Sequence, residues 1–255
     1  EIHFGDINLL SLPEHEIEKL RGERLAMIFQ DPLTSLNPYL TIARQLTEVL
    51  EVHQGATPTV ARRTSIEMLE RVGIPDAAER IDQHPHQFSG GQRQRVGIAR
   101  ALAVSPEFLV CDESIAALDV SIQAQIINLF VDLKDRFDLT YLFISHDIGV
   151  IEHISDRVIV MYLGRIVETA PIEAFSKQPN HPYTQALLAG VPRLEVGKRQ
   201  YEPISGEIPS PLSPPTGCHF HPRCKFATAR CKTEKPALRE IAPAHFSACH
   251  LNEEA

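Results

Sequence analysis

The sequence predicts an α/β protein in which a largely parallel sheet carries an inserted helical subdomain and is followed by a small cysteine- and proline-rich module. Short apolar runs alternate with helical patterns over most of the chain. Three helical patterns follow one another between residues 41 and 83. The segment 198–255 holds eight of the 19 prolines and four of the five cysteines, a composition that favours loops over a packed core.

The composition narrows the class of protein further. With 255 residues, 43% of them hydrophobic, the chain can build a large core and an appendage. We expect the core to comprise residues 1–40 and 84–194, the helical subdomain residues 41–83, and the C-terminal extension residues 195–255. The net charge of −8 disfavours nucleic-acid binding, which needs a basic face. No apolar run approaches the roughly 20 residues of a membrane span.

The first half of the chain supplies one buried strand and three helices. Residues 1–7 are consistent with a strand, and residues 14–21 with a short helix after Pro13. The apolar run 25–29 predicts a buried strand that ends at Gln30. A loop with two prolines follows it, over residues 31–38. Helical spacing then covers residues 42–53, 60–72 and 76–81.

The second half supplies two more strands that end in polar residues. A strand over 107–111 ends in Asp112 and Glu113, and a strand over 140–144 ends shortly before His146. Ligands of α/β sheets bind at the carboxyl ends of parallel strands. The remaining patterns predict helices over 96–103 and 121–137, a hairpin over 157–168 and a short helix from residue 181.

A hydroxyl and two glycines stand directly before the helix that begins near residue 96, in the stretch Ser89-Gly90-Gly91-Gln92. Glycines let the backbone approach an anion, and a helix start offers unpaired N–H groups. Together with Phe88, this stretch resembles the signature loop Leu-Ser-Gly-Gly-Gln of the ATP-binding subunits of ABC transporters. Its first position departs from that pattern. The resemblance implies the P-loop NTPase-type (ABC ATPase) fold.

The resemblance also implies ATP and Mg²⁺ as cofactors. It assigns Mg²⁺ to Asp112 and Gln30, the attacking water to Glu113 and Gln30, and the γ-phosphate to His146. Taken alone, each of these residues has a simpler interpretation: a polar strand end, a chance acidic pair and a structural histidine. Ser89, Gly90, Gly91, Gln92 and Asp119 are implied to contact the ATP molecule at a dimer interface.

The segments that contain Gln30 and residues 181–188 resemble the ATPases of peptide and nickel importers. This implies an ATPase that powers peptide import from the cytoplasmic face of a bacterial inner membrane. Its partners are a second ABC ATPase subunit, homologous or identical, two membrane permease subunits and, indirectly, a peptide-binding protein. One alternative is a degenerate, non-hydrolysing subunit that donates its signature loop to a partner's ATP site. Another is an ABC ATPase of DNA repair or translation, which the acidic charge and the cysteine tail disfavour.

The 255 residues contain no Gly-x-x-x-x-Gly-Lys-Ser/Thr phosphate-binding loop. Their one Gly-Lys pair, Gly197-Lys198, is followed by Arg199 in place of serine or threonine, and no glycine stands five residues before Gly197. In the family this loop precedes the segment that matches Glu1. We therefore expect the 255-residue polypeptide alone to be inactive, with no appreciable ATP hydrolysis, because the loop supplies most of the phosphate binding.

The tail presents Cys218, Cys224, Cys231 and Cys249 with the spacing C-x5-C-x6-C-x17-C. A loop-rich module of this size needs a staple, which in a reducing compartment is a metal. Four thiolates suit an iron–sulfur cluster, and the resemblance to peptide-importer ATPases implies a [4Fe-4S] cluster. Zinc, with help from the nearby histidines, and four unconnected thiols are the alternatives. The fifth cysteine, Cys111, is expected to be a buried apolar residue.

Overall fold

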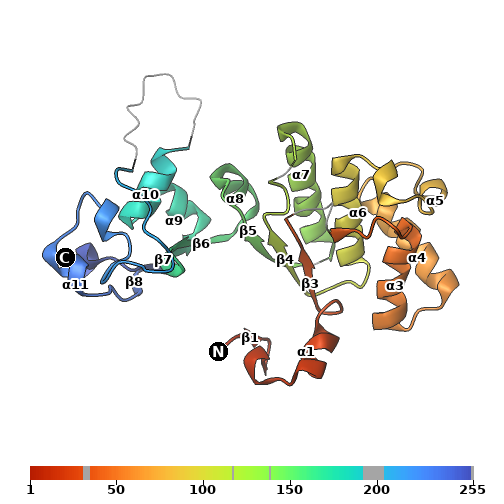
Figure 1. The fold of residues 1–255 in the computed structure, drawn as a ribbon, viewed down its shortest axis with the longest axis horizontal. Coiled ribbons are helices and arrows are strands. Elements are labelled where there is room, and N and C mark those ends of the chain that lie inside the picture. Colours follow the sequence, from red (N-terminus) through yellow and green to blue (C-terminus); the bar gives the residue numbers. More distant parts are fainter. Residues whose placement is uncertain (31–34, 117, 138, 192–203, 254–255) are drawn as a thin grey trace. The chain divides into compact units, whose positions relative to one another are not determined.

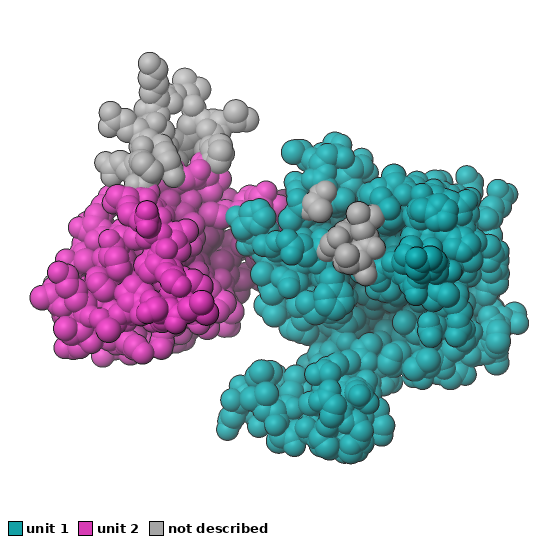
Figure 2. All heavy atoms as spheres, in the orientation of Figure 1, with its two compact units in different colours: residues 1–146 teal, residues 147–255 magenta. Residues whose placement is uncertain are grey.

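The computed structural model describes residues 1–30, 35–116, 118–137, 139–191 and 204–253 (Figure 1). They form two compact units, Glu1–His146 and Asp147–Ala255 (Figure 2). The first unit contains a parallel three-stranded sheet, and the second an antiparallel four-stranded sheet. None of the described helices has the length and apolar character that crossing a membrane requires.

The first unit begins with a small hairpin and a helix. Strands β1 (His3–Phe4) and β2 (Ile7–Asn8) pair antiparallel and precede helix α1 (Glu14–Leu20). The single strand predicted over residues 1–7 is therefore wrong, because the chain reverses between β1 and β2. The helix predicted after Pro13 is confirmed.

The central sheet of the first unit is parallel, with strand order β3-β4-β5. Its strands are β3 (Leu25–Ile28), β4 (Phe108–Asp112) and β5 (Thr140–Ile144). Ile28 lies opposite Cys111, and Asp112 lies opposite Ile144, so the three strands end at nearly the same level. This register brings the residues that follow the strands to one edge.

Helices cover one face of this sheet. Helix α7 (Val120–Phe137) packs Phe130 edge-on against the rings of Tyr141 and Phe143 in β5, at centroid distances of 5.7 and 5.6 Å. Helix α6 (Gly90–Leu102) contacts β3. The opposite face keeps apolar side chains exposed, namely Met27, Leu142 and Ile144. Parallel sheets normally have both faces covered.

The three helices predicted between residues 41 and 83 are confirmed as α3 (Ile42–Gln54), α4 (Pro58–Arg71) and α5 (Ala77–Arg80). Thr41 caps α3 through its hydroxyl, and helices α3 and α4 pack on each other and on α6. The side-chain amide of buried Gln45 donates to the carbonyls of Asn37 and Leu40. This clamps the part of the loop after Gln30 that the structure describes; residues 31–34 of the predicted loop lie outside the described residues.

The second unit joins the segment after His146 to the cysteine-rich tail. Its strands are β6 (Arg157–Tyr162), β7 (Arg165–Pro171), β8 (Arg239–Ala242) and β9 (His245–Ser247). Its helices are α8 (Ile148–Ile154), α9 (Ile172–Lys177), α10 (Pro182–Ala189) and α11 (Ala229–Thr233). The predicted hairpin is confirmed as β6 and β7. The expectation of little regular structure in the tail is wrong for residues 229–247, because β9 pairs with β7 and completes the sheet.

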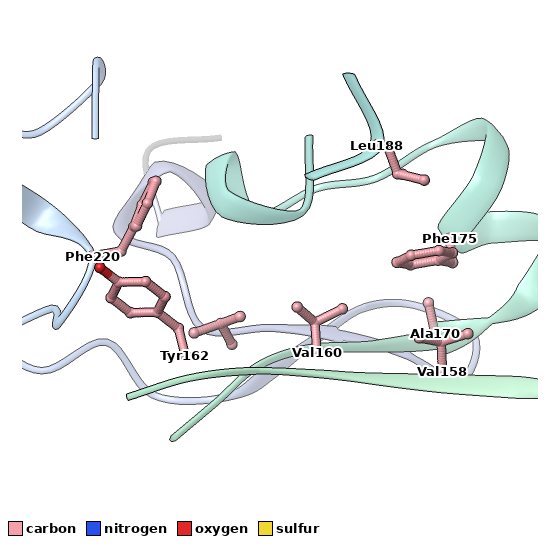
Figure 3. Close-up of a cluster of buried hydrophobic side chains, with 8 residues drawn as sticks. Val158, Val160, Tyr162, Ala170, Phe175, Leu188 and Phe220 are labelled. Carbon is pink, nitrogen blue, oxygen red and sulfur yellow. The ribbon is translucent and has the colours of Figure 1, made fainter. Parts of the chain in front are cut away.

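One hydrophobic cluster holds the second unit together (Figure 3). Tyr162 of β6 and Phe220 of the tail meet edge-on, with ring centroids 5.3 Å apart. Val158, Val160 and Phe175 extend the same cluster along β6 and α9. Because Phe220 comes from the tail, burial of apolar surface binds the tail to the hairpin.

A buried polar network ties β7 to the start of α10 and to β9. Glu168 is fully buried and accepts hydrogen bonds from the backbone N–H groups of Asn180 and His181, at 2.8 and 2.9 Å. The Nε2 atom of His245 lies 2.7 Å from the same carboxylate. The carboxylate is thus satisfied by three partners, as a buried charge requires.

His181 gives the second unit a predicted pH dependence. Burial lowers the pKa of His181 to about 4, although Glu168 opposes the shift. Between about pH 6.5 and pH 4, His181 therefore binds a proton in the unfolded chain but not in the folded chain. The free energy of unfolding falls as the pH decreases through this range. The expected loss is about 3 kcal/mol.

The measurement is urea unfolding of His181→Asn and of the unsubstituted protein between neutral and acidic pH. Asparagine can replace the bond that Nδ1 of His181 accepts from the Tyr183 N–H. We expect the substitution to flatten the pH dependence, whereas the exposed His153→Asn in the same unit leaves it unchanged. An equal acid loss in all three proteins would contradict the assignment to His181.

Candidate active site

Three predicted site residues meet at the carboxyl edge of the parallel sheet. Gln30 follows β3, Glu113 follows β4 and His146 lies two residues beyond β5. The side-chain amide of Gln30 donates to Oε2 of Glu113 at 2.6 Å. Nδ1 of His146 lies 3.4 Å from the other oxygen, Oε1. Each carboxylate oxygen therefore has one neighbour, an arrangement of the kind that general-base catalysis uses.

The backbone at Glu113 adopts a strained conformation. Its φ angle is +43°, in a region that side chains other than glycine seldom occupy. The Glu113 N–H is held by the carbonyl of Ile144, at 3.0 Å, so the sheet itself fixes this conformation. Strain of this kind is concentrated at functional sites. The side chain stays about one-third exposed (32%), and His146 is largely exposed, so both can reach a ligand.

Asp112 fits the predicted role of a magnesium ligand. It is the last residue of β4 and is half-buried beside Glu113. Among the described residues, its carboxylate forms no hydrogen bond or ion pair, so its oxygens are available. Oxygen ligands from a carboxylate and an amide are those that Mg²⁺ prefers.

The signature stretch begins α6 directly and is not a loop before it. The predicted helix over 96–103 starts six residues earlier, with Ser89 as its N-cap. The Ser89 hydroxyl accepts from the Gln92 N–H at 3.3 Å, and the Gln92 side chain accepts from the Ser89 N–H at 3.1 Å. This reciprocal capping box orders the helix start, whose remaining free N–H groups suit a phosphate.

Two arginines that no sequence pattern singles out hold the start of this helix in place. Arg80 of α5 lies 4.3 Å over the Phe88 ring and donates to the Gln92 side chain at 3.3 Å. Arg95 of α6 donates to the Val72 carbonyl at 2.6 Å and to Gln125 of α7 at 3.2 Å. No local pattern marks either arginine. The buried aromatic Phe88, where the resembling motif has leucine, is the signal that could have pointed to a cation above it.

Gly91 packs against helix α7. A Cβ at this position would lie 2.7 Å from Cγ2 of Ile122, whereas a Cβ on Gly90 would meet open space. Gly91→Ala should therefore lower the free energy of unfolding by about 1–3 kcal/mol, since an isoleucine branched at Cβ cannot turn aside easily. Gly90→Ala is the control, with little change or a gain of about 0.5–1 kcal/mol.

Chemical denaturation of the two glycine variants measures this contact, and a double-mutant cycle isolates it. The cost of Gly91→Ala should shrink in an Ile122→Ala background, because the colliding methyl group is gone. Equal costs in both backgrounds would show that the two residues do not press on each other.

Asp119 lies just before α7 and organises its start. Its carboxylate accepts from the Ser121 hydroxyl at 2.7 Å and from the Ile122 N–H at 3.0 Å. The hydrogen bond from Ser121, helped by the one from Ile122, lowers the pKa of Asp119. Within the described residues, no hydrogen bond joins Asp119 or the signature stretch to Glu113, and Ala117 lies outside them. The structure thus gathers Gln30, Glu113 and His146, and presents the signature stretch separately.

The four tail cysteines line one small cavity in the second unit, together with His181, His221 and His250. Burial, with smaller contributions from Cys224, Cys218 and Cys231, raises the pKa of Cys249 to about 11. The sulfur atoms are therefore close enough to interact. Yet among the described residues no three His, Cys, Asp or Glu side chains are arranged to hold a metal ion. Cys111 is fully buried in β4, as predicted.

Two protein families match separate parts of the chain. Residues 1–116 match the ABC transporter family, and residues 167–231 match the family described as Oligopeptide/dipeptide transporter, C-terminal region. Among solved structures, the dimeric structure of a post-hydrolysis state of the ATP-binding cassette MJ0796, bound to ADP and Pi, is similar. It has 28% identity and a TM-score of 0.59 and covers 67% of this chain and 72% of that one.

Curated relatives match nearly the whole chain. The probable peptide ABC transporter ATP-binding protein y4tR of Sinorhizobium fredii is 47% identical over 100% of this chain and 76% of its own length. The oligopeptide transport ATP-binding protein AppF of Bacillus subtilis is 48% identical over 98% and 77%. The dipeptide transport ATP-binding protein DppD of Escherichia coli is 43% identical over 98% and 76%. With this identity and coverage, and with the strand-edge site and the signature helix in place, the chain belongs to the ATP-binding proteins of oligopeptide- and dipeptide-type ABC transporters.

Proposed function

We propose that this chain belongs to an ATP-hydrolysing subunit that powers the import of peptides by an ABC transporter, and that the 255 residues alone do not hydrolyse ATP. The observation that carries the proposal is the convergence of Gln30 and His146 on the carboxylate of Glu113 at the sheet edge. The names of the relatives, which are peptide, oligopeptide and dipeptide transport proteins, support the class of cargo.

The proposed chemistry divides among four residues. Glu113 accepts a proton from the water that attacks the γ-phosphate, and Gln30 fixes the carboxylate through its 2.6 Å hydrogen bond. His146 is exposed beside Glu113 and donates to the γ-phosphate. Asp112 and Gln30 would hold Mg²⁺, which neutralises charge on the phosphate oxygens when it is bound.

The proposed assembly contains a second ABC ATPase subunit, two permease subunits and a peptide-binding protein that delivers cargo. Ser89, Gly90, Gly91 and Gln92 face the ATP of the second subunit, with Asp119 nearby, and the exposure of the α6 start supports this role. The subunit is peripheral, on the cytoplasmic face of a bacterial inner membrane. Residues 1–40 and 84–194 form its ATPase core, residues 41–83 its helical subdomain and residues 195–255 its extension.

A growth assay tests the function. A strain that lacks this gene and requires an amino acid should fail to grow when that amino acid is supplied as a short peptide, and should grow on the free amino acid. The complete gene should restore growth on the peptide, and the same gene with His146→Ala should not. Restored growth with both versions, or full growth of the deleted strain on the peptide when no other peptide transporter is present, would contradict the proposal.

The tail cysteines are further proposed to hold an iron–sulfur cluster. Their four side chains line one small cavity, and four thiolates are the ligand set of a [4Fe-4S] cluster. Burial also raises the pKa of Cys218 and Cys224, and binding to a cluster would offset the cost of ionising these buried thiols.

Anaerobic purification of the full protein tests the cluster. A broad visible absorbance, with iron and acid-labile sulfide that Cys249→Ser removes, is the expected result. Cys111→Ala is the matched control, because Cys111 lies in the other unit and should leave the absorbance unchanged. A colourless protein with stoichiometric zinc, or with no metal, would contradict the cluster.

A further inference from the structure

The second unit contains a second, larger cavity that the ATPase reaction does not use. Its volume is about 390 Å³, within the roughly 300–1,000 Å³ typical of small-molecule sites. The wall is built by Gly164–Val167 at the start of β7, by Gly217–His219, by Lys235, Pro236 and Leu238, and by Ala248. All of these residues belong to one compact unit, so the cavity is a property of that unit alone.

The charged side chains that line the cavity are all positive. Arg165 and Lys235 line it, and no aspartate or glutamate does. Among the described residues neither cation forms an ion pair. In a chain with a net charge of −8, two unpaired cations on one concave wall produce a local field that attracts an anion.

His219 adds a buried polar group to the same wall. It is 8% exposed, and its Nε2 atom accepts from Nε of Arg165 at 3.2 Å. The Nδ1 atom then carries the proton of the neutral ring; the Leu163 carbonyl lies near the ring, but its geometry with Nδ1 falls short of a hydrogen bond. Leaving a buried donor unsatisfied is unfavourable, so an acceptor that reached this nitrogen would be favoured.

The remaining wall is apolar. Ile166 and Leu238 are each 42% exposed, and Val167, Pro236 and Ala248 also line the cavity. A simple inorganic anion would leave these side chains in water, whereas an apolar chain would cover them. The two cations favour a ligand with a negative charge, and the apolar wall favours one with an apolar part, so together they favour a ligand that has both.

We propose that this cavity binds a small amphipathic organic anion, with a carboxylate or phosphate head near Arg165 and Lys235 and an apolar body against Ile166 and Leu238. Arg165 offers a planar pair of donors to such a head, and Lys235 a point charge. Cys218 lines both this cavity and the cysteine cavity, so the ligand would sit beside the proposed cluster without forming part of it.

Isothermal titration of the full protein with octanoate tests the proposal. We expect saturable binding of octanoate, and no measurable binding of octanol, which lacks the charge, or of acetate, which lacks the apolar body. Octyl phosphate is titrated alongside. Tighter binding of either anion supports the proposal and identifies the preferred head group.

Two lysine variants localise the binding. Lys235→Ala should weaken the binding of octanoate about tenfold, the effect of losing one charged partner. Lys232→Ala removes the same charge from an exposed lysine outside the cavity lining and should leave the affinity unchanged. Both sites are exposed, so the variants should fold. An equal affinity in Lys235→Ala, an equal loss in both variants, binding of octanol as tight as that of octanoate, or no binding of either anion would overturn the proposal.

Discussion

Glu113→Gln is expected to slow ATP hydrolysis by the assembled transporter by about two to four orders of magnitude, the usual contribution of a general base. Glutamine has nearly the same shape and can still accept the hydrogen bond from Gln30, so the site geometry should survive. What disappears is a group that can take a proton from water. Binding of ATP should therefore remain while release of phosphate slows to the same extent.

The matched control is Glu107→Gln, which makes the same change at the other end of the β4 region. Glu107 is exposed and pairs with Arg24 at the surface, so its loss should leave turnover unchanged. Phosphate release is measured in the transporter with its permease and partner subunits. Where the partner is a different chain, its own site is inactivated in all samples. Undiminished release with Glu113→Gln would show that Glu113 is not the general base. No release from the unsubstituted subunit under these conditions would favour the non-hydrolysing alternative, in which the chain only donates its signature stretch.

Gly217→Ala is expected to destabilise the second unit by about 3 kcal/mol or more. The φ angle of Gly217 is +65°, where a side chain is strained. A Cβ would collide with the carbonyl oxygen of Cys231 and would lie 2.8 Å from the carbonyl carbon of Lys232. These are backbone atoms of α11, which cannot rotate away as a side chain can.

Gly164→Ala separates the backbone strain at a positive φ angle from the steric collision with α11. Gly164 has a similar φ angle, +74°, but a Cβ there would meet nothing within 4 Å. It should therefore cost only the backbone strain of about 1–2 kcal/mol. Urea unfolding of both variants gives the difference, which measures the collision with α11. Equal losses would mean that α11 yields to the new methyl group and that the close packing of Gly217 is unimportant.

Much of the candidate site could be predicted from the sequence because it depends on local patterns. The apolar runs before Gln30, Glu113 and His146 predict strands, and parallel strands bring their carboxyl ends to one edge whatever the details of packing. Ser89 and Gln92 have the spacing of a capping box, a local signal for a helix start six residues before the predicted one. The resemblance to ABC transporters added the assignment of roles, and the comparisons confirmed the family.

Other features could not be predicted, because they depend on pairs of residues far apart in the chain. Helix packing decides the close contact between Gly91 and Ile122. It also decides that Arg80 lies over the Phe88 ring. The pairing of β9 with β7 makes the tail part of a larger sheet, although its composition suggested a separate module. No local rule specifies such a pairing, because strand register is set by the surfaces that meet.

The sequence by itself therefore determined the three strands of the parallel sheet and the residues that follow them, since periodicity acts within a few residues. The tertiary structure alone decided that Glu113 would be held at a positive φ angle between two neighbours, that four cysteines would line one cavity, and that two unpaired cations would share another. These features arise where distant segments pack together, and the contacts that create them have no counterpart in any single stretch of the chain.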